Sequence, residues 1–492
     1  MFIARFANKG VEVFRQVRMR GRLFTLGLIS TKSLSVIHRR KRSQAMASES
    51  GRNSFSLSSR LLRGWVKLGL MMVLQCAPCR TDAMGPHTSA SSWQAEAPPA
   101  GAVDGDYFGV NPSAVWKGRP GAGSWWWQCW WDEPRDVGAI LQINGDDPLR
   151  LRNAPQKSTW QSSLDGLQWN DLAETSVESE RRAFRLHRLK STHRLRYLRL
   201  KIDSAQGAFP TLREVKTFAD SRVPVEFPDW VVIVSTLDEA EWDKGHPEGR
   251  EFVALARRCP GWEHIQAQHV WLGSFDEQFV SAEPRPLCAF LSGNFSEWCQ
   301  KDRTAWQGTE EVLRTGRLPM WGACGGAQGL AILAAVGTGK PWDCPRCRDP
   351  NHPQAPIYGH IGHTSKRPLK CGDYTDCIFE RGPHNVLQVA EDPLFRELPR
   401  VFRVMESHCG QIEYVPTGWV QIATKGAGTQ TDLQCLRVKD HYIYAAQFHI
   451  EMAGTPETSR RIMANFLKIA KTCGGYNPAA QSVPPPRKFR EK

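Results

Sequence analysis

The segment Trp321-Gly322-Ala323-Cys324-Gly325-Gly326-Ala327-Gln328 is the most informative part of this 492-residue chain. The short apolar stretch 317–320 before it predicts the end of a buried strand, and the apolar, proline-free run 329–336 after it predicts a helix. A Gly-x-Cys-x-Gly between strand and helix is the cysteine form of a nucleophile elbow. We therefore expect Cys324 in a strained turn whose small neighbours let strand and helix pack closely. The alternative is a buried structural cysteine in a glycine-rich turn.

A second motif near the C-terminus supplies the groups that a thiol nucleophile requires. The predicted strand 441–448 is followed by His449-Ile450-Glu451, and a helix is predicted from about residue 456 to 471. A thiol nucleophile needs a base, and the base needs a group that orients it. His449 and Glu451 are the candidates for these two roles.

The two motifs together resemble those of the class I glutamine amidotransferases, whose pattern is a Gly-x-Cys-x-Gly-x-Gln elbow and a later Gln-Phe-His-x-Glu. The resemblance covers about residues 228–473, roughly half of the chain. It implies that Cys324, His449 and Glu451 form a catalytic triad in which the cysteine attacks an amide.

The same resemblance implies residues for substrate binding. Gln328 matches the glutamine that holds the amino-acid end of the substrate, and the backbone N–H groups of Gly293 and Gly325 match the oxyanion donors. The family's Ser-His-Gly-Asp segment corresponds to Ser407-His408-Cys409-Gly410, with His408 as a substrate-site residue. The replaced Gly and Asp put the substrate specificity in question more than the chemistry.

The net charge of +14 belongs almost entirely to the first 67 residues. These hold 15 of the 64 Lys and Arg residues but two of the 50 Asp and Glu residues, so the rest of the chain is nearly neutral. The sequence therefore lacks the basic stripe that is typical of DNA- or RNA-binding proteins, and we expect no nucleic-acid partner.

Residues 1–77 form a basic leader that resembles a targeting segment. Basic residues precede an apolar core at 68–77, which is the pattern of a secretory signal peptide and is too short to span a bilayer. Because this core lies far from the N-terminus, we expect translation to begin at Met46. The leader predicts an exported protein, periplasmic or extracellular, with Cys76 as a candidate for lipid attachment. The alternatives are an uncleaved amphipathic helix and a cytoplasmic protein.

The segment after the leader predicts a linker and then a β-rich domain. Residues 78–100 are rich in Pro, Ala, Ser and Thr and predict a linker. Apolar and polar residues alternate at 138–143 and 195–202, which predicts an antiparallel β-sandwich over residues 101–221.

Five tryptophans between residues 125 and 131, together with the segments 103–105, 162–169, 197–200 and 212–215, resemble the discoidin (coagulation-factor C-terminal) family of jelly-roll modules. The resemblance implies a galactose-binding-like module that binds a glycan or another surface ligand through loops at one end. The alternative is a structural sandwich whose tryptophans fill the core.

From Asp229 onward the pattern is that of an α/β domain. The continuous apolar run 230–234 is typical of a buried parallel strand. Further strands and helices alternate after it, which predicts a doubly wound, flavodoxin-like domain over residues 228–473. The strands are expected at 269–272 and 288–291, and the helices at 248–258 and 307–315. The Pro- and Lys/Arg-rich tail 474–492 predicts disorder.

Four cysteines between the elbow and His408 are weak candidates for a metal site: Cys344, Cys347, Cys371 and Cys377. The first pair has the Cys-x-x-Cys spacing of a zinc site, but the second pair is too widely spaced. Disulfides, which suit an exported protein, and free thiols are the alternatives. No motif in the sequence predicts a cofactor.

The sequence leaves three functions open. The first is a thiol amidohydrolase of the amidotransferase type, which releases ammonia or passes it to a separate synthase. The second is an exported γ-glutamyl peptide hydrolase with the same triad, which suits a surface-binding module. The third is a non-catalytic binding protein whose active part is the sandwich. Cellular location discriminates between the first two.

Overall fold

The computed structural model describes residues 85–489 apart from 108–110, 112, 148, 223, 245–247, 295, 343–355, 363–373, 376 and 480–482. The predicted leader and the cysteines Cys344, Cys347 and Cys371 lie outside the described residues. Ala83–Lys492 forms one compact unit. No helix among the described residues is both long enough and apolar enough to cross a membrane.

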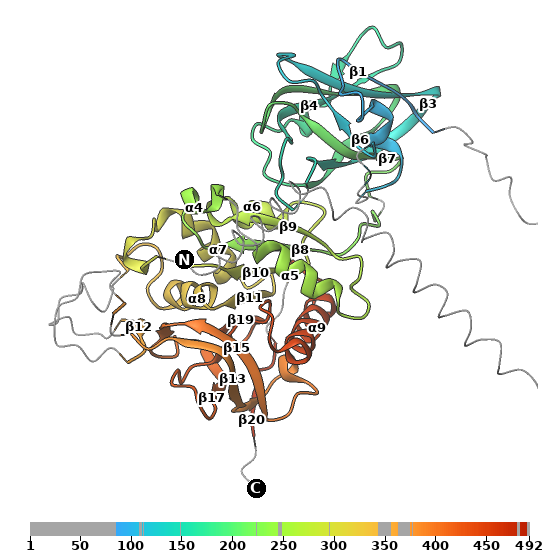
Figure 1. The fold of residues 1–492 in the computed structure, drawn as a ribbon. Coiled ribbons are helices and arrows are strands. Elements are labelled where there is room, and N and C mark those ends of the chain that lie inside the picture. Colours follow the sequence, from blue (N-terminus) through green and yellow to red (C-terminus); the bar gives the residue numbers. More distant parts are fainter. Residues whose placement is uncertain are drawn as a thin grey trace, which may run out of the picture. The chain divides into compact units, whose positions relative to one another are not determined.

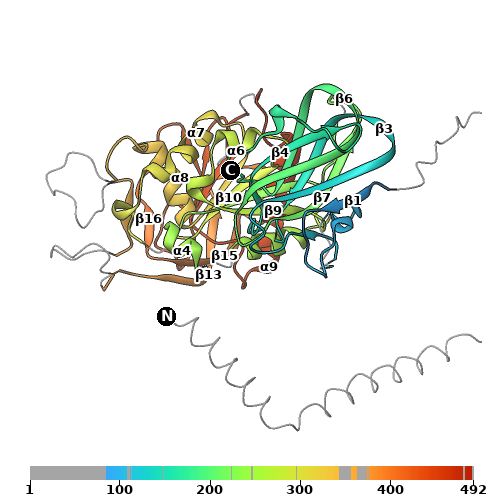
Figure 2. The same cartoon turned by 90° about the horizontal axis from the view of Figure 1, so that it is seen from above.

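The first folded part is the predicted antiparallel β-sandwich (Figure 1). Its strands are β1 (His87–Ala90), β2 (Trp116–Lys117), β3 (Trp125–Asn144), β4 (Pro155–Ser163), β5 (Asn170–Asp171), β6 (Phe184–Ala205) and β7 (Thr211–Phe218). They follow the order β2-β7-β3-β6-β4-β5, and β1 pairs with β3. The long strands β3 and β6 run side by side (Figure 2), so that β3 has β1 as its other neighbour in its first half and β7 in its second.

The five tryptophans of β3 divide between the two faces of the strand. Trp125, Trp127 and Trp131 are buried in the sandwich core, whereas Trp126 and Trp130 are half-buried on the other face. This division follows the two-residue period of a strand. Three of the five tryptophans therefore fill the core of the sandwich, and two do not.

Two segments differ from the sequence-based expectation because they pair with distant strands. The predicted linker 78–100 contains β1, whose four residues pair with Trp127–Trp130 of β3. The predicted disordered tail contains β20 (Arg487–Lys488), which pairs with β14 (Ala390–Glu391). Both strands are too short to show a two-residue period, and their hydrogen-bond partners lie far away in the sequence.

The second part is an α/β domain built on a nine-stranded sheet. The strand order is β15-β13-β17-β18-β19-β11-β10-β8-β9. The five strands from β19 to β9 in this order are parallel to one another. The four strands from β15 to β18 pair antiparallel. The strands are β8 (Trp230–Ser235), β9 (Gln266–Trp271), β10 (Cys288–Ser292), β11 (Met320–Ala323), β13 (Glu380–Gln388), β15 (Val401–His408), β17 (Trp419–Lys425), β18 (Cys435–Val438) and β19 (Ile443–Ala446). A separate pair is formed by β12 (Tyr358–His360) and β16 (Gly410–Ile412).

Helices cover both faces of this sheet. They are α4 (Glu239–Asp243), α5 (Glu248–Arg257), α6 (Glu277–Ser281), α7 (Gln307–Thr315), α8 (Gly325–Ala335) and α9 (Pro456–Thr472). In β8, Val232 joins the apolar cluster of Leu330 in α8, while its neighbour Ile233 joins the cluster of Phe466 in α9. Figure 1 shows α8 on one side of the sheet and the adjacent α5 and α9 on the other. The fold is therefore doubly wound, as predicted, with an antiparallel extension that the sequence did not predict.

Candidate active site

Cys324 lies in the turn between β11 and α8 with φ +48° and ψ −108°. Non-glycine residues rarely adopt a positive φ, and such strain costs about 1–3 kcal/mol. Two backbone hydrogen bonds hold the turn: Cys324 N–H donates to the carbonyl of Ala446 at 2.8 Å, and its carbonyl accepts from Gln328 N–H at 3.0 Å. The elbow is thus joined to the end of β19, the strand that leads to His449.

The glycines on either side of Cys324 permit a very close approach of backbone to backbone. A Cβ atom on Gly326 would lie 2.1 Å from the carbonyl oxygen of Leu291 in β10. A Cβ atom on Gly322 would lie 2.7 Å from the carbonyl carbon of Gly326. The small neighbours that the motif requires are therefore explained by packing between β10, β11 and α8.

We predict that Gly326→Ala lowers the free energy of unfolding by about 3 kcal/mol, because backbone atoms must shift to admit the methyl group. The matched control is Gly339→Ala, where a Cβ atom would meet open space, and its effect should stay within about 0.5 kcal/mol. Urea unfolding of both variants measures the difference. Equal midpoints for the two would contradict the packing described here.

His449 follows β19 by three residues and is bound to Glu451. Its Nδ1 lies 2.6 Å from Oε1 of Glu451, and its backbone N–H donates to the carbonyl of Met405 at 2.8 Å. The buried Nε2 makes no hydrogen bond to an oxygen or nitrogen atom of the described residues, which leaves it for the Cys324 thiol. Glu451 Oε1 also accepts a hydrogen bond from Ser292 at the end of β10, at 3.4 Å.

The electrostatics of this group favour a protonated imidazole. Burial by itself lowers the pKa of His449, but the charge of Glu451 and then that of Cys324, together with the hydrogen bond to Glu451, outweigh burial and raise this pKa well above its usual value. An imidazolium beside a cysteine stabilises the thiolate, which is the reactive form.

The two predicted oxyanion donors belong to segments that contact each other. Gly293 follows β10 with φ +88°, and its carbonyl accepts a hydrogen bond from the hydroxyl of Thr236. A Cβ atom on Gly325 would lie 2.4 Å from Cβ of Asn294 and 3.1 Å from its backbone nitrogen. The loop after β10 therefore meets the first turn of α8, and Asn294 N–H is a further candidate donor that the sequence motifs did not single out.

The side chain of Gln328 is buried and largely occupied by protein contacts. Its Nε2 donates to the carbonyl of Gly410 at 3.0 Å and to Oε1 of Gln447 at 3.3 Å. Its Oε1 accepts from Trp298 Nε1 at 3.1 Å, which leaves one lone pair of this oxygen for a ligand. Gln328 thus links the elbow helix to the Gly410 segment.

His408 is buried between two carboxylates. Its Nε2 lies 2.9 Å from Oε2 of Glu406 and 3.3 Å from Oε2 of Glu380, and its Nδ1 lies 2.9 Å from the carbonyl of Gly410. His408 and Gln328 therefore meet at the same carbonyl oxygen. Neither carboxylate was identified from the sequence, because nothing in their local pattern marks them.

Of the four candidate metal-binding cysteines, Cys377 lies among the described residues. It is close to His360 and Cys409. Burial raises the pKa of the Cys409 thiol to about 12, and the charges of Cys377, Glu297 and Cys324 act in the same direction. Cys409 therefore lies near both Cys377 and the elbow cysteine.

Residues 293–469 match the family model described as "Glutamine amidotransferase class-I". This part of the chain therefore carries a class I glutamine amidotransferase domain.

Similar curated proteins include the glutamine-hydrolyzing GMP synthase of Thermosipho melanesiensis. It is 39% identical over 89 residues, which are 18% of this chain and 17% of the relative. One subunit of the glutamine-hydrolyzing GMP synthase from Pyrococcus abyssi is 31% identical over 98 residues, 19% of this chain and 48% of the relative. The chain thus spans less than half the length of these relatives.

Two solved structures illustrate what the two parts are similar to. A protein described as a subunit of GMP synthase from Thermoplasma acidophilum covers 50% of this chain and 96% of its own, with 19% identity and a TM-score of 0.35. Chitosan-binding module 1 of a chitosanase/glucanase from Paenibacillus sp. IK-5 covers 28% of this chain and 96% of its own, with 16% identity and a TM-score of 0.24.

Proposed function

We propose that the α/β domain hydrolyses the side-chain amide of glutamine, or a γ-glutamyl amide, through a thioester on Cys324. The observation that carries the proposal is the pair of His449 and Glu451, joined at 2.6 Å, beside a cysteine held in a strained turn at the end of a strand. The charge of Cys324 also acts on His449, which supports a set of nucleophile, base and orienting group as covalent acyl transfer requires.

In the first half-reaction the Cys324 thiolate attacks the amide carbon and a tetrahedral oxyanion forms. Backbone N–H groups of Gly325 and of the Gly293 loop stabilise its negative charge. The imidazolium of His449 gives its proton to the amide nitrogen, the C–N bond breaks, and ammonia leaves the thioester behind.

In the second half-reaction neutral His449 takes a proton from water, and the hydroxide attacks the thioester carbon. The C–S bond breaks, glutamate is released and the thiolate and imidazolium are restored. Glu451 holds the ring in the required orientation through Nδ1. The remaining lone pair of Gln328 Oε1 accepts a hydrogen bond from the α-ammonium group of the substrate, and His408 supports the Gly410 carbonyl beside it.

The test is intact-mass analysis after incubation with an electrophilic glutamine analogue of the diazo-ketone class. We expect one adduct, located on Cys324 by peptide mapping, and protection by excess glutamine. An adduct on another cysteine, or none at all in folded protein, would overturn the proposal.

The same site can serve a γ-glutamyl peptide, and the replaced segment Cys409-Gly410 is where the two substrates would differ. Comparison of kcat/KM for glutamine with that for a γ-glutamyl dipeptide discriminates between them. A preference for the dipeptide would assign the chain to γ-glutamyl peptide hydrolysis.

We propose that the ammonia is either released or taken up by a separate synthase. The relative from Pyrococcus abyssi is named as one subunit of a synthase, which favours an ammonia-accepting partner. We propose from the basic leader that the chain is exported. An exported location favours release of the ammonia over its transfer to a synthase. The mass of the mature N-terminus, measured in the labelling experiment above, tests export directly.

We also propose that the sandwich binds a carbohydrate through the loop between β4 and β5. Leu164 and Leu167 are 60% and 84% exposed there, which is unusual for two large aliphatic side chains in one loop. The loop is well ordered, because Asp165 Oδ1 accepts from the N–H groups of Leu167 at 2.8 Å and Gln168 at 2.9 Å. An ordered apolar loop beside polar groups suits the apolar face of a sugar ring.

We predict that Leu167→Ser weakens retention on the matching polysaccharide about tenfold, the equivalent of about 1.4 kcal/mol. Affinity electrophoresis through chitosan, pectin and galactan gels measures it. The matched control is Val401→Ser, an aliphatic residue that is 50% exposed in β15 of the other domain. If wild type migrates equally fast in gels with and without each polysaccharide, the proposal is contradicted.

A further inference from the structure

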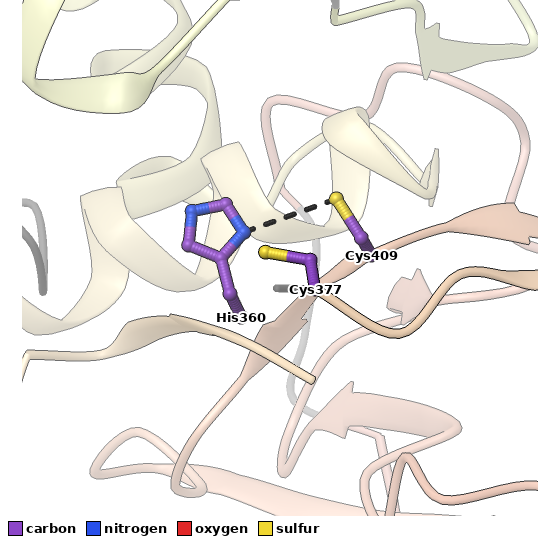
Figure 3. Close-up of side chains that lie close together, drawn as sticks. All are labelled: His360, Cys377 and Cys409. Carbon is purple, nitrogen blue, oxygen red and sulfur yellow. Dashed lines mark hydrogen bonds between the residues drawn. The ribbon is translucent and has the colours of Figure 1, made fainter. Parts of the chain in front are cut away.

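We propose that His360, Cys377 and Cys409 form a binding site for a single Zn²⁺ ion beside the elbow. The ligand atoms of the three side chains all lie within 4.8 Å of one another, and His360 Nδ1 lies 3.9 Å from the Cys409 sulfur. Tetrahedral zinc with bonds of about 2.0–2.3 Å holds its ligand atoms at similar mutual separations. Figure 3 shows the two sulfur atoms and one ring nitrogen pointing toward a common space.

The backbone brings the three ligands together by specific hydrogen bonds. Ile361 N–H, next to His360, donates to the carbonyl of Cys409 at 2.8 Å. Ile378 N–H, next to Cys377, donates to the carbonyl of Ile361 at 3.0 Å. The ligands therefore come from β12, from the segment before β13 and from the corner between β15 and β16.

An independent observation indicates that His360 is a metal ligand and not an ordinary core histidine: a carboxylate lies on the far side of its imidazole ring. Glu297 Oε1 lies 3.2 Å from Nε2 of His360, and both side chains are fully buried. A histidine that binds a metal through one nitrogen commonly donates its other N–H to a carboxylate, which fixes the tautomer and orients the ring. Here Nε2 faces the carboxylate and Nδ1 faces the sulfur atoms.

The donor set selects the class of metal. Two thiolates and one imidazole are soft or borderline ligands, which favour Zn²⁺ over Mg²⁺ or Ca²⁺. Three protein ligands leave a fourth position for water or another donor. A bound ion would hold the Cys409-Gly410 corner, whose Gly410 carbonyl accepts the hydrogen bond from Gln328. The site would thus support the segment that contacts Gln328 in the elbow helix.

The test replaces zinc by Co²⁺ in the full chain, because cobalt reports its ligands by visible and thiolate charge-transfer absorption. We expect about one equivalent of Co²⁺ with a tetrahedral spectrum in wild type. Cys409→Gly and Cys377→Ser should each lose the spectrum, while the control Cys473→Ser should keep it. Circular dichroism of each variant checks that the chain is folded, and His360→Gln should weaken binding at least tenfold.

Two results would overturn the zinc site. One is a cobalt spectrum that is unchanged in Cys409→Gly, which would mean that the metal is held elsewhere. Loss of the spectrum in the double variant Cys344→Ser/Cys347→Ser would then locate the metal at those two cysteines. The other is a Cys377–Cys409 disulfide, seen as a loss of two mass units in purified protein, that persists after mild reduction and leaves the chain unable to take up cobalt or zinc.

Discussion

Cys324→Ala is expected to reduce kcat/KM for amide hydrolysis by roughly 10⁴- to 10⁶-fold while the thermal transition stays close to that of wild type. Alanine keeps the Cβ atom and hence the strained backbone of the turn, so the fold loses no packing beyond one sulfur atom. The measurement is glutamate release by purified protein, with Tm recorded on the same samples.

The matched control for this variant is Cys473→Ala, which removes a half-buried cysteine at the end of α9. It should hydrolyse the amide at the wild-type rate. Residual turnover in Cys324→Ala that resists further purification would remove Cys324 as the nucleophile, and a large fall in Tm would show that the residue has a structural role instead.

His449→Asn is expected to cost more than Glu451→Gln. His449 moves a proton in both half-reactions, so its loss should reduce kcat/KM about 10³-fold or more. Glu451 only orients the ring and stabilises its positive charge, so the amide variant should lose roughly 10- to 10³-fold. The measurement is kcat/KM for both variants on glutamine or a γ-glutamyl anilide, alongside the alkylation rate of Cys324. If Glu451→Gln is as damaging as His449→Asn while alkylation stays fast, Glu451 must act in the deacylation step itself.

The same pair predicts a shift in the pH dependence. The charge of Glu451 raises the pKa of His449, so its removal in Glu451→Gln lowers that pKa. The imidazolium is then lost at lower pH, and the alkaline limb of kcat/KM should move to lower pH. An unmoved alkaline limb in Glu451→Gln would mean that Glu451 does not govern the protonation of His449.

The parts of the fold that the sequence predicted are those with strong local patterns. The helix expected at 307–315 is α7 within the same bounds, and the buried run 230–234 is β8. The elbow and the His-x-Glu motif were located because the residue types that the chemistry needs stand close together in the sequence. Their meeting follows from the neighbouring positions of β11 and β19 in the parallel part of the sheet.

The contacts that escaped prediction depend on residues far apart in the chain. The spacing of Cys377 from Cys371 was a poor match to a metal site, and no local pattern indicated that Cys377 lies beside His360 and Cys409. Glu380 reaches His408 because β13 and β15 pair in a register that no local pattern reveals, whereas Glu406 shares one face of β15 with His408. Such partners are set by strand pairing, which single-sequence periodicity does not encode.

The strained backbone of Cys324 also has an evolutionary consequence, because keeping a cysteine at this position costs stability. Glycine adopts positive φ angles without steric cost, so Cys324→Gly would relieve about 1–3 kcal/mol of strain, partly offset by the greater freedom of glycine in the unfolded chain. Mutational drift therefore favours loss of the sulfur wherever hydrolysis brings no benefit to the cell. In related proteins, glycine at this position is therefore expected to accompany loss of thiol hydrolysis, and cysteine its retention.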